Sequence, residues 1–401
     1  MFNSLLQNVQ FSFTKCSILS LKRSYQRYPH GVYFLANKIF LASLNVLFSQ
    51  KTSVSLQSFS RIGMKFQRVI SSSQATLPVV CAIAAALWFV LPLHHGSEDF
   101  LGADYGVWQY LPDLFHDYQY ALPLGIICAA IGVYMMVELK NRNLLLRVNS
   151  YMLSSTLALL LALCAPLHPM QPSSLITIFV LYAYFPLFAS YQIPHPYITF
   201  PIYLPLSIAS LLLPQLLLLA PVYWCLQIYL RSFTFRNFIA SLIAIILPYW
   251  FYGAIAVVTD STPQFIAHLQ AVVSTPDLFA VPSLSDELHR LSTSDILTSS
   301  LPALILTIIM LIIGIVDFQQ NSLLDKTRTR SLYKVVIWHA VSIIIAMALF
   351  YRHANTFLPI LMLDTSILYG HFFTLTHTRA SHIINIIVAL LMTAVLAVQC
   401  L

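Results

Sequence analysis

The sequence predicts an all-α fold: a polytopic transmembrane helical bundle of about 11 spans, within a range of roughly 9 to 12. Of its 401 residues, 58% are hydrophobic and only 9% are charged, whereas soluble domains carry about 25% charged residues. The apolar residues also occur in runs of roughly 17–20, the length that crosses a hydrocarbon core of about 30 Å. Because lipid cannot satisfy backbone amides, each run must be a helix.

The expected spans follow from apolar runs between turn and charge signals. Nine runs each suffice for one helix: Thr76–Leu93, Tyr120–Val137, Tyr151–Pro166, Ser174–Ala189, Phe238–Val258, Ser299–Val316, Val335–Phe350, Phe357–Phe373 and Ile383–Cys400. The stretch Thr199–Leu230 is too long for one helix. Pro214 removes a backbone donor within it, so we divide it into two short spans. After Asp260, apolar residues at helical spacing predict short amphipathic helices.

The distribution of charge predicts the orientation. With Lys65 and Arg68 on the cytoplasmic side, the alternating spans place most basic residues in cytoplasmic loops, as the positive-inside rule requires. Those residues are Lys140, Arg142, Arg147, Arg231, Arg236, Lys326, Arg328, Arg330, Lys334 and Arg379. Only Arg290 and Arg352 fall outside, together with most of the acids. We therefore expect a multi-pass protein of a bacterial inner membrane, with a cytoplasmic N-terminus and an external C-terminus.

The first 63 residues form a basic, Ser-rich leader, which we expect to be disordered or not part of the natural chain. No acidic residue occurs before Glu98. This composition fits a transit peptide. It also fits an over-extended start, because a chain beginning at Met64 would open with a short basic stretch before the first span. We favour the second interpretation, and assign residues 64–401 to the transmembrane domain. The charge of the remainder is nearly balanced, which gives no reason to expect nucleic acid as a partner.

The most conspicuous polar residue is Asp364, in the middle of an apolar run. An ionised carboxylate in hydrocarbon is costly, so such a residue normally faces the protein interior and often marks an ion or proton path. His371 lies two helical turns further on, on the same face, and His339 lies in the preceding span. We predict an intramembrane polar cluster of Asp364, His371 and His339. The alternative is a neutral Asp364 with a purely structural hydrogen bond.

Two further sets of residues have the chemistry of a site. Glu98 and Asp99 follow the first span on the predicted outer side, where an acid serves glycosyl transfer in GT-C glycosyltransferases; a carboxylate there could act as a general base. They are the candidates for a catalytic pair. His371, His377 and His382 have spacings that match no common metal-ligand pattern. We expect neither a metal nor a cofactor.

The segment from Leu226 to Gly253 resembles a family of uncharacterised bacterial inner-membrane proteins, a domain of unknown function. The residues that carry the resemblance are Arg231, Ser232, Phe233, Phe235 and Arg236, then Leu247, Pro248 and Tyr249, with the closing HFFTLTHTR at 371–379. The resemblance implies a membrane fold and no particular reaction. From their chemistry, Arg231 and Arg236 bracket a cytoplasmic turn and can reach lipid phosphates.

These observations predict a non-enzymatic component of an envelope or membrane complex. Its expected partners are the lipid bilayer and other membrane proteins. Two alternatives remain open: a secondary transporter with an intramembrane Asp/His site, and a GT-C-like lipid-linked glycosyltransferase.

Overall fold

The computed structural model describes residues 67, 70, 71, 73, 75–91, 108, 118–272 and 295–399. Their α-helices are α4 (Thr76–Val90), α5 (Tyr118–Asn143), α6 (Met152–Ala162), α7 (Pro172–Ala189), α8 (Pro196–Leu212), α9 (Ala220–Tyr229), α10 (Phe235–Val258), α11 (Thr262–Val272), α14 (Asp295–Asn321), α15 (Thr327–Leu349), α16 (Ala354–Leu375) and α17 (Arg379–Gln399). Short 3₁₀ helices are η5 (Ala165–Leu167), η6 (Pro214–Leu219), η7 (Ser322–Leu324) and η8 (Tyr351–His353). The predicted leader, residues 1–63, lies outside the described residues.

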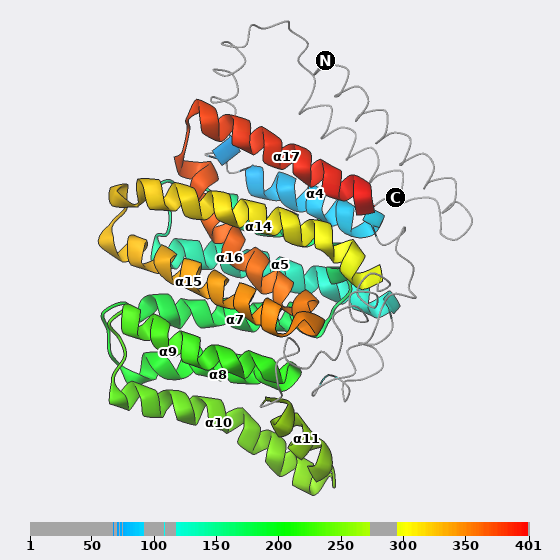
Figure 1. The fold of residues 1–401 in the computed structure, drawn as a ribbon, viewed down its shortest axis with the longest axis vertical. Helices are drawn as coiled ribbons and strands as arrows, with labels where there is room; N and C mark the ends of the chain where they lie inside the picture. Colours follow the sequence, from blue (N-terminus) through cyan, green and yellow to red (C-terminus); the bar gives the residue numbers. More distant parts are fainter. Residues whose placement is uncertain are drawn as a thin grey trace, which may run out of the picture.

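The long helices lie side by side with their axes in roughly one direction (Figure 1). Helices α17 and α4 lie at one end of this array, and α10 and α11 lie at the other (Figure 1). Helix α16 packs against α14, α15, α6 and α7, whereas α8 packs between α7 and α10. No strand occurs among the described residues, so the all-helical prediction is confirmed for that part of the chain.

Seven described helices are long and apolar enough to cross a membrane, which marks the chain as a helical membrane protein. They contain the spans Gln119–Asn143, Pro172–Ala189, Phe235–Val258, Ser300–Leu324, Thr327–Leu349, Ala354–Leu375 and Ala380–Gln399. Helices α4, α6 and α8 are apolar but shorter, and α9 has only 10 residues. Each predicted apolar run overlaps at least one described helix, but the predicted count of about 11 spans is not confirmed.

Several helices extend beyond the apolar runs that predicted them. Helix α15 begins at Thr327, eight residues before the predicted start at Val335, and α14 continues past Val316 to Asn321. Hydropathy locates only the part of a helix that lipid can surround. Backbone hydrogen bonding continues into the polar residues on either side, so these boundaries are wrong by one to two turns.

Helix α16 is the buried centre of the bundle. All residues from Thr356 to Phe372 are buried. Two glycines permit close helix packing: a Cβ on Gly370 would lie 2.8 Å from the Leu153 Cα of α6, and one on Gly314 would lie 2.8 Å from the Leu368 carbonyl carbon. At the edge of the array, α10 exposes Ile243, Ile246, Trp250 and other large apolar side chains, as expected for a surface that contacts lipid.

The turns that carry most of the basic residues lie at one end of the helices, which we call the basic end. It includes the α5–α6, α7–α8, α9–α10, α14–α15 and α16–α17 turns (Figure 1). Hydrogen bonds join neighbouring turns there: Gln192 N donates to Leu230 O, and Arg147 pairs with Asp325. Placing this end in the cytoplasm remains a proposal from the charge pattern.

An amphipathic helix was expected after Asp260, and α11 occupies that position. It packs against η6 and α10. Its His268 is buried beside the rings of Tyr249 and Tyr252, while Ile266 and Leu269 are exposed. The rest of that predicted amphipathic segment, 273–294, lies outside the described residues.

Candidate functional site

Four fully buried polar side chains meet in the interior of the bundle, and we call them the core cluster: Tyr184, Tyr223, His339 and Asp364. They come from four helices, α7, α9, α15 and α16. His339 and Asp364 lie near the middles of α15 and α16, surrounded by apolar residues. The cluster therefore lies where the bilayer would exclude water.

The hydrogen bonds of the core cluster converge on Asp364. Tyr184 Oη donates to Asp364 Oδ1, and His339 Nδ1 lies 2.7 Å from Asp364 Oδ2. The same His339 nitrogen lies 2.7 Å from Tyr184 Oη, and Tyr223 Oη lies 3.4 Å from the other ring nitrogen, Nε2. Both carboxylate oxygens and both imidazole nitrogens thus have partners.

This geometry has two proton occupancies that differ by one charge. With a proton on Nδ1 alone, His339 donates to an ionised Asp364 and accepts from Tyr223 at Nε2. The cluster then carries one negative charge in apolar surroundings, which is costly. One added proton, on the imidazole or on the carboxylate, removes the net charge while the residues stay in contact. Both proton occupancies are therefore compatible with the same set of contacts.

Polar contacts continue from the core cluster toward the basic end. The ring of Tyr203 lies edge-on to that of Tyr223, with centroids 6.3 Å apart. Tyr203 Oη donates to Gln227 Oε1 at 3.1 Å, and Gln227 Nε2 donates to Thr199 Oγ1 at 3.4 Å. Because Thr199 lies in the first turn of α8, this row of buried polar groups approaches the α7–α8 turn.

His371 does not join the core cluster, and this part of the prediction was wrong. Seven residues place His371 on the face of Asp364, but at about 1.5 Å per residue they also place it about 10 Å further along α16. There its Nε2 lies 3.2 Å from Asp325 Oδ2. Of the predicted trio, the structure brings together only His339 and Asp364.

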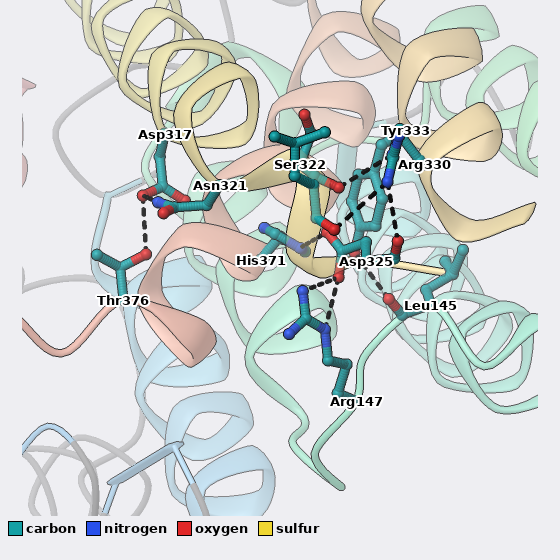
Figure 2. A network of polar contacts seen from close by, with 11 residues as sticks. Leu145, Arg147, Asp317, Asn321, Ser322, Asp325, Arg330, Tyr333, His371 and Thr376 are labelled. Carbon is teal, nitrogen blue, oxygen red and sulfur yellow. Dashed lines mark hydrogen bonds and ion pairs between the residues drawn. The ribbon is translucent and has the colours of Figure 1, made fainter. Parts of the chain in front are cut away.

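His371 belongs to a second group, the basic-end cluster, formed with Arg147, Asp325 and Tyr333 (Figure 2). Arg147 Nη2 lies 2.6 Å from Asp325 Oδ1. The Tyr333 ring packs against the His371 ring at 4.5 Å between centroids, and Tyr333 Oη donates to Leu145 O at 3.3 Å. These contacts tie the α5–α6 turn, the α14–α15 turn and the end of α16 together.

Asp325 is the charged centre of the basic-end cluster, and its side chain is 1% exposed. Burial raises its pKa, but hydrogen bonds from His371 and Arg147 and their positive charge outweigh burial, so the pKa lies below its ordinary value. Asp325 is therefore an ionised acceptor at neutral pH, and its charge holds the two turns together.

The predicted turn residues Arg231 and Arg236 lie at the basic end, between α9 and α10. Both are exposed, and Arg231 has a positive φ of 57° that reverses the chain. The turn is fixed by residues to which we had assigned no role: Thr234 caps α10 by accepting from Asn237 N, and Asn237 Nδ2 donates to Ser232 O at 2.5 Å. A contact between these exposed guanidinium groups and lipid phosphates remains a proposal.

The weak catalytic candidates, Glu98 and Asp99, lie outside the described residues, so their role remains a prediction. No group of three or more His, Cys, Asp or Glu side chains suited to a metal occurs in the described part of the chain.

Sequence reasoning missed Tyr184, Tyr223, Arg147 and Asp325 as site residues. A tyrosine in an apolar run has no distinguishing signal. Asp325, in contrast, is the only acid in a basic loop, and this could have identified it as the partner of a basic side chain.

Comparison of the chain with protein-family models, with curated proteins and with solved structures found no match. The resemblance based on Arg231 and its neighbours therefore remains a prediction.

Proposed function

We propose that this chain is a secondary transporter of the membrane, in which the core cluster binds and releases the coupling proton. The observation that supports the proposal is the closed set of contacts among Tyr184, His339 and Asp364. An intramembrane carboxylate with an imidazole partner is a costly arrangement, and such groups mark proton paths in pumps and transporters.

The position of the core cluster supports the same proposal. Its residues lie on α7, α9, α15 and α16, so a movement between these four helices would change its contacts. Transporters bind substrate and coupling ion near the membrane midplane, at the interface between bundles that move relative to each other.

A change of one charge gives the site a mechanism. Protonation neutralises the core cluster, which lowers the cost of keeping it in an apolar interior. Deprotonation leaves a buried negative charge, which favours an arrangement that admits water or a counter-ion. The two protonation states thus favour different packings of α7 and α9 against α15 and α16. A difference of this kind couples proton movement to a conformational change.

The test compares wild type with Asp364→Asn in proteoliposomes that contain a pH-sensitive dye. With an imposed inward proton gradient, a panel of sugars, amino acids, organic anions and organic cations is added outside. We expect at least one solute to accelerate proton entry in wild type, and Asp364→Asn to abolish this acceleration while the protein stays folded. His339→Gln should have the same effect, because it removes the second proton-binding group.

The exposed acid Asp260 provides a matched control, and Asp260→Asn should behave as wild type. Coupled proton entry that persists in Asp364→Asn would show that the core cluster is structural. Infrared difference spectra between pH 5 and pH 9 provide a second measurement. A carboxyl or imidazole band that is present in wild type and lost in Asp364→Asn or His339→Gln would come from the core cluster. If no such band is found, the cluster does not change its protonation between these pH values, and the proposal fails.

A further inference from the structure

A third polar group, also at the basic end, contains a buried carboxylate that has no basic partner among the described residues. Asp317, near the end of α14, is 7% exposed. Its Oδ1 accepts from Asn321 Nδ2 at 2.8 Å and from Thr376 Oγ1 at 2.8 Å. Figure 2 shows these three residues together, beside the basic-end cluster. Both donors are neutral, so neither compensates the carboxylate charge.

The second oxygen, Asp317 Oδ2, is buried and has no hydrogen-bond partner among the described residues. The contrast with Asp325 is direct, because that carboxylate has Arg147 and His371 as cationic or ionisable partners. A buried carboxylate without such a partner is unfavourable unless a proton or a cation accompanies it.

A second side chain nearby also has an unpaired buried oxygen. Gln67 is 3% exposed. Its Nε2 donates to Phe373 O at 2.9 Å and to Thr376 O at 3.0 Å, while its Oε1 has no partner within the described part of the chain. Thr376 thus joins Gln67, through its carbonyl, to Asp317, through its hydroxyl.

The described backbone carbonyls beside this group contribute negative partial charge. The carbonyls of Phe373 and Thr376 belong to the last turn and cap of α16, where the helix dipole contributes partial negative charge. A carboxylate at a helix C-terminus is unfavourable in the absence of positive charge. The unpaired buried atoms of Asp317 and Gln67 are both oxygens, and oxygen ligands suit hard cations.

We propose that Asp317, Gln67 and Thr376 form a binding site for one monovalent alkali cation at the basic end. One carboxylate balances one positive charge, and the amide and hydroxyl oxygens add neutral ligands. A divalent ion would retain an uncompensated charge in a largely buried position. The site uses none of the core-cluster residues, so it is independent of the proposed transport function.

The test measures thermal unfolding of the purified full chain in detergent, in NaCl, KCl or choline chloride at equal ionic strength. Choline serves as the reference because it is too large to enter. We expect Na⁺ or K⁺ to raise Tm relative to choline by roughly 2–4 °C, with saturation as the concentration increases. Asp317→Asn should abolish the difference, and Asp260→Asn should retain it.

The stability of Asp317→Asn in choline gives a second criterion. Because the variant lacks the uncompensated charge, it should unfold in choline at the same temperature as wild type or higher. Thr376→Val keeps the carboxylate but removes its hydroxyl partner, so it should raise the half-saturating cation concentration about 10-fold or more. Broadening of the ²³Na⁺ resonance by wild type, and less by Asp317→Asn, would measure binding without relying on unfolding.

Equal Tm values in all three salts would overturn the proposal and indicate that a proton neutralises Asp317. An alkali effect of the same size in Asp317→Asn would also overturn it, since the cation would then bind elsewhere.

Discussion

Asp325 is the residue whose pH dependence follows most directly from its contacts. Its pKa is lowered in the folded state because His371 and Arg147 stabilise the charged carboxylate more than burial destabilises it. A lowered folded-state pKa adds stability above the pKa of the unfolded chain. That stability disappears as the pH falls through the folded value. The basic-end cluster should therefore weaken in acid.

We predict that Asp325→Asn lowers the unfolding free energy by about 2 kcal/mol at pH 7, because hydrogen bonds to a buried charge are lost. The difference from wild type should shrink as the pH falls below about 4, where the unfolded carboxylate becomes protonated. Chemical denaturation in detergent at a series of pH values measures this. A difference that stays constant down to pH 3 would contradict the assigned charge state.

Some residues of the core cluster can be recognised from the sequence, and others cannot. Asp364 and His339 are conspicuous, because ionisable groups are rare in apolar runs. Their partners Tyr184 and Tyr223 are among 21 tyrosines in the chain, and nothing in the local sequence distinguishes them. His371 was assigned to the wrong cluster because helical periodicity defines a face but does not show which turn of a neighbouring helix packs beside it.

At the scale of helices, glycine determines how closely α16 approaches its neighbours. The backbone of α6 lies against Gly370, and α14 approaches α16 through Gly314. Small residues at helix crossings allow the van der Waals contact that holds membrane helices together. The buried position of α16 therefore depends on the absence of two side chains.

We predict that Gly370→Ala and Gly314→Ala each lower stability by about 1–3 kcal/mol, because the added methyl group forces the backbones apart. Gly132→Ala in α5 is the matched control: a Cβ there meets nothing within 4 Å. Because alanine favours a helix more than glycine does, this control should be neutral or slightly stabilising. Thermal unfolding of the three variants in one detergent makes the comparison. Equal losses in all three would indicate a general effect of glycine replacement.

The ends of the helices were less predictable than their centres. Lipid-length apolar runs indicate where a helix must exist, but they do not indicate where it stops. The α14–α15 turn is the clearest case. Its residues are largely polar, yet Arg330 donates to the carbonyls of Ser322, Leu323 and Asp325 and so orders it as a compact connection.

For the whole molecule, the charge pattern predicts which side each end of the bundle faces. The α14–α15 turn and the α10–α11 turn lie at opposite ends of the helices (Figure 1). Leu323 is 80% exposed in the first turn, and Asp260 is exposed in the second. Both positions can therefore be labelled without disturbing packing.

In a variant whose six native cysteines are replaced, Leu323→Cys should react with a membrane-impermeant reagent only after the membrane is opened. Asp260→Cys should react in sealed cells. A reporter fused after Cys400 should register outside. Labelling of Leu323→Cys in sealed cells would show that the orientation is opposite to the proposed one. A cytoplasmic reporter would show that the predicted number of spans is wrong by one.

The amino-acid sequence is enough to identify the chain as a helical membrane protein, because a chain so poor in charge and so rich in long apolar runs can satisfy its backbone only as helices within lipid. It also identified Asp364 and His339, since their cost in an apolar run is a local property. Only the three-dimensional packing shows that Tyr184 and Tyr223 complete the core cluster, that His371 pairs with Asp325, and that Asp317 has no basic partner within the described part of the chain. Those pairings depend on how helices distant in sequence are rotated and shifted against one another, and close packing at positions such as Gly370 fixes those rotations and shifts.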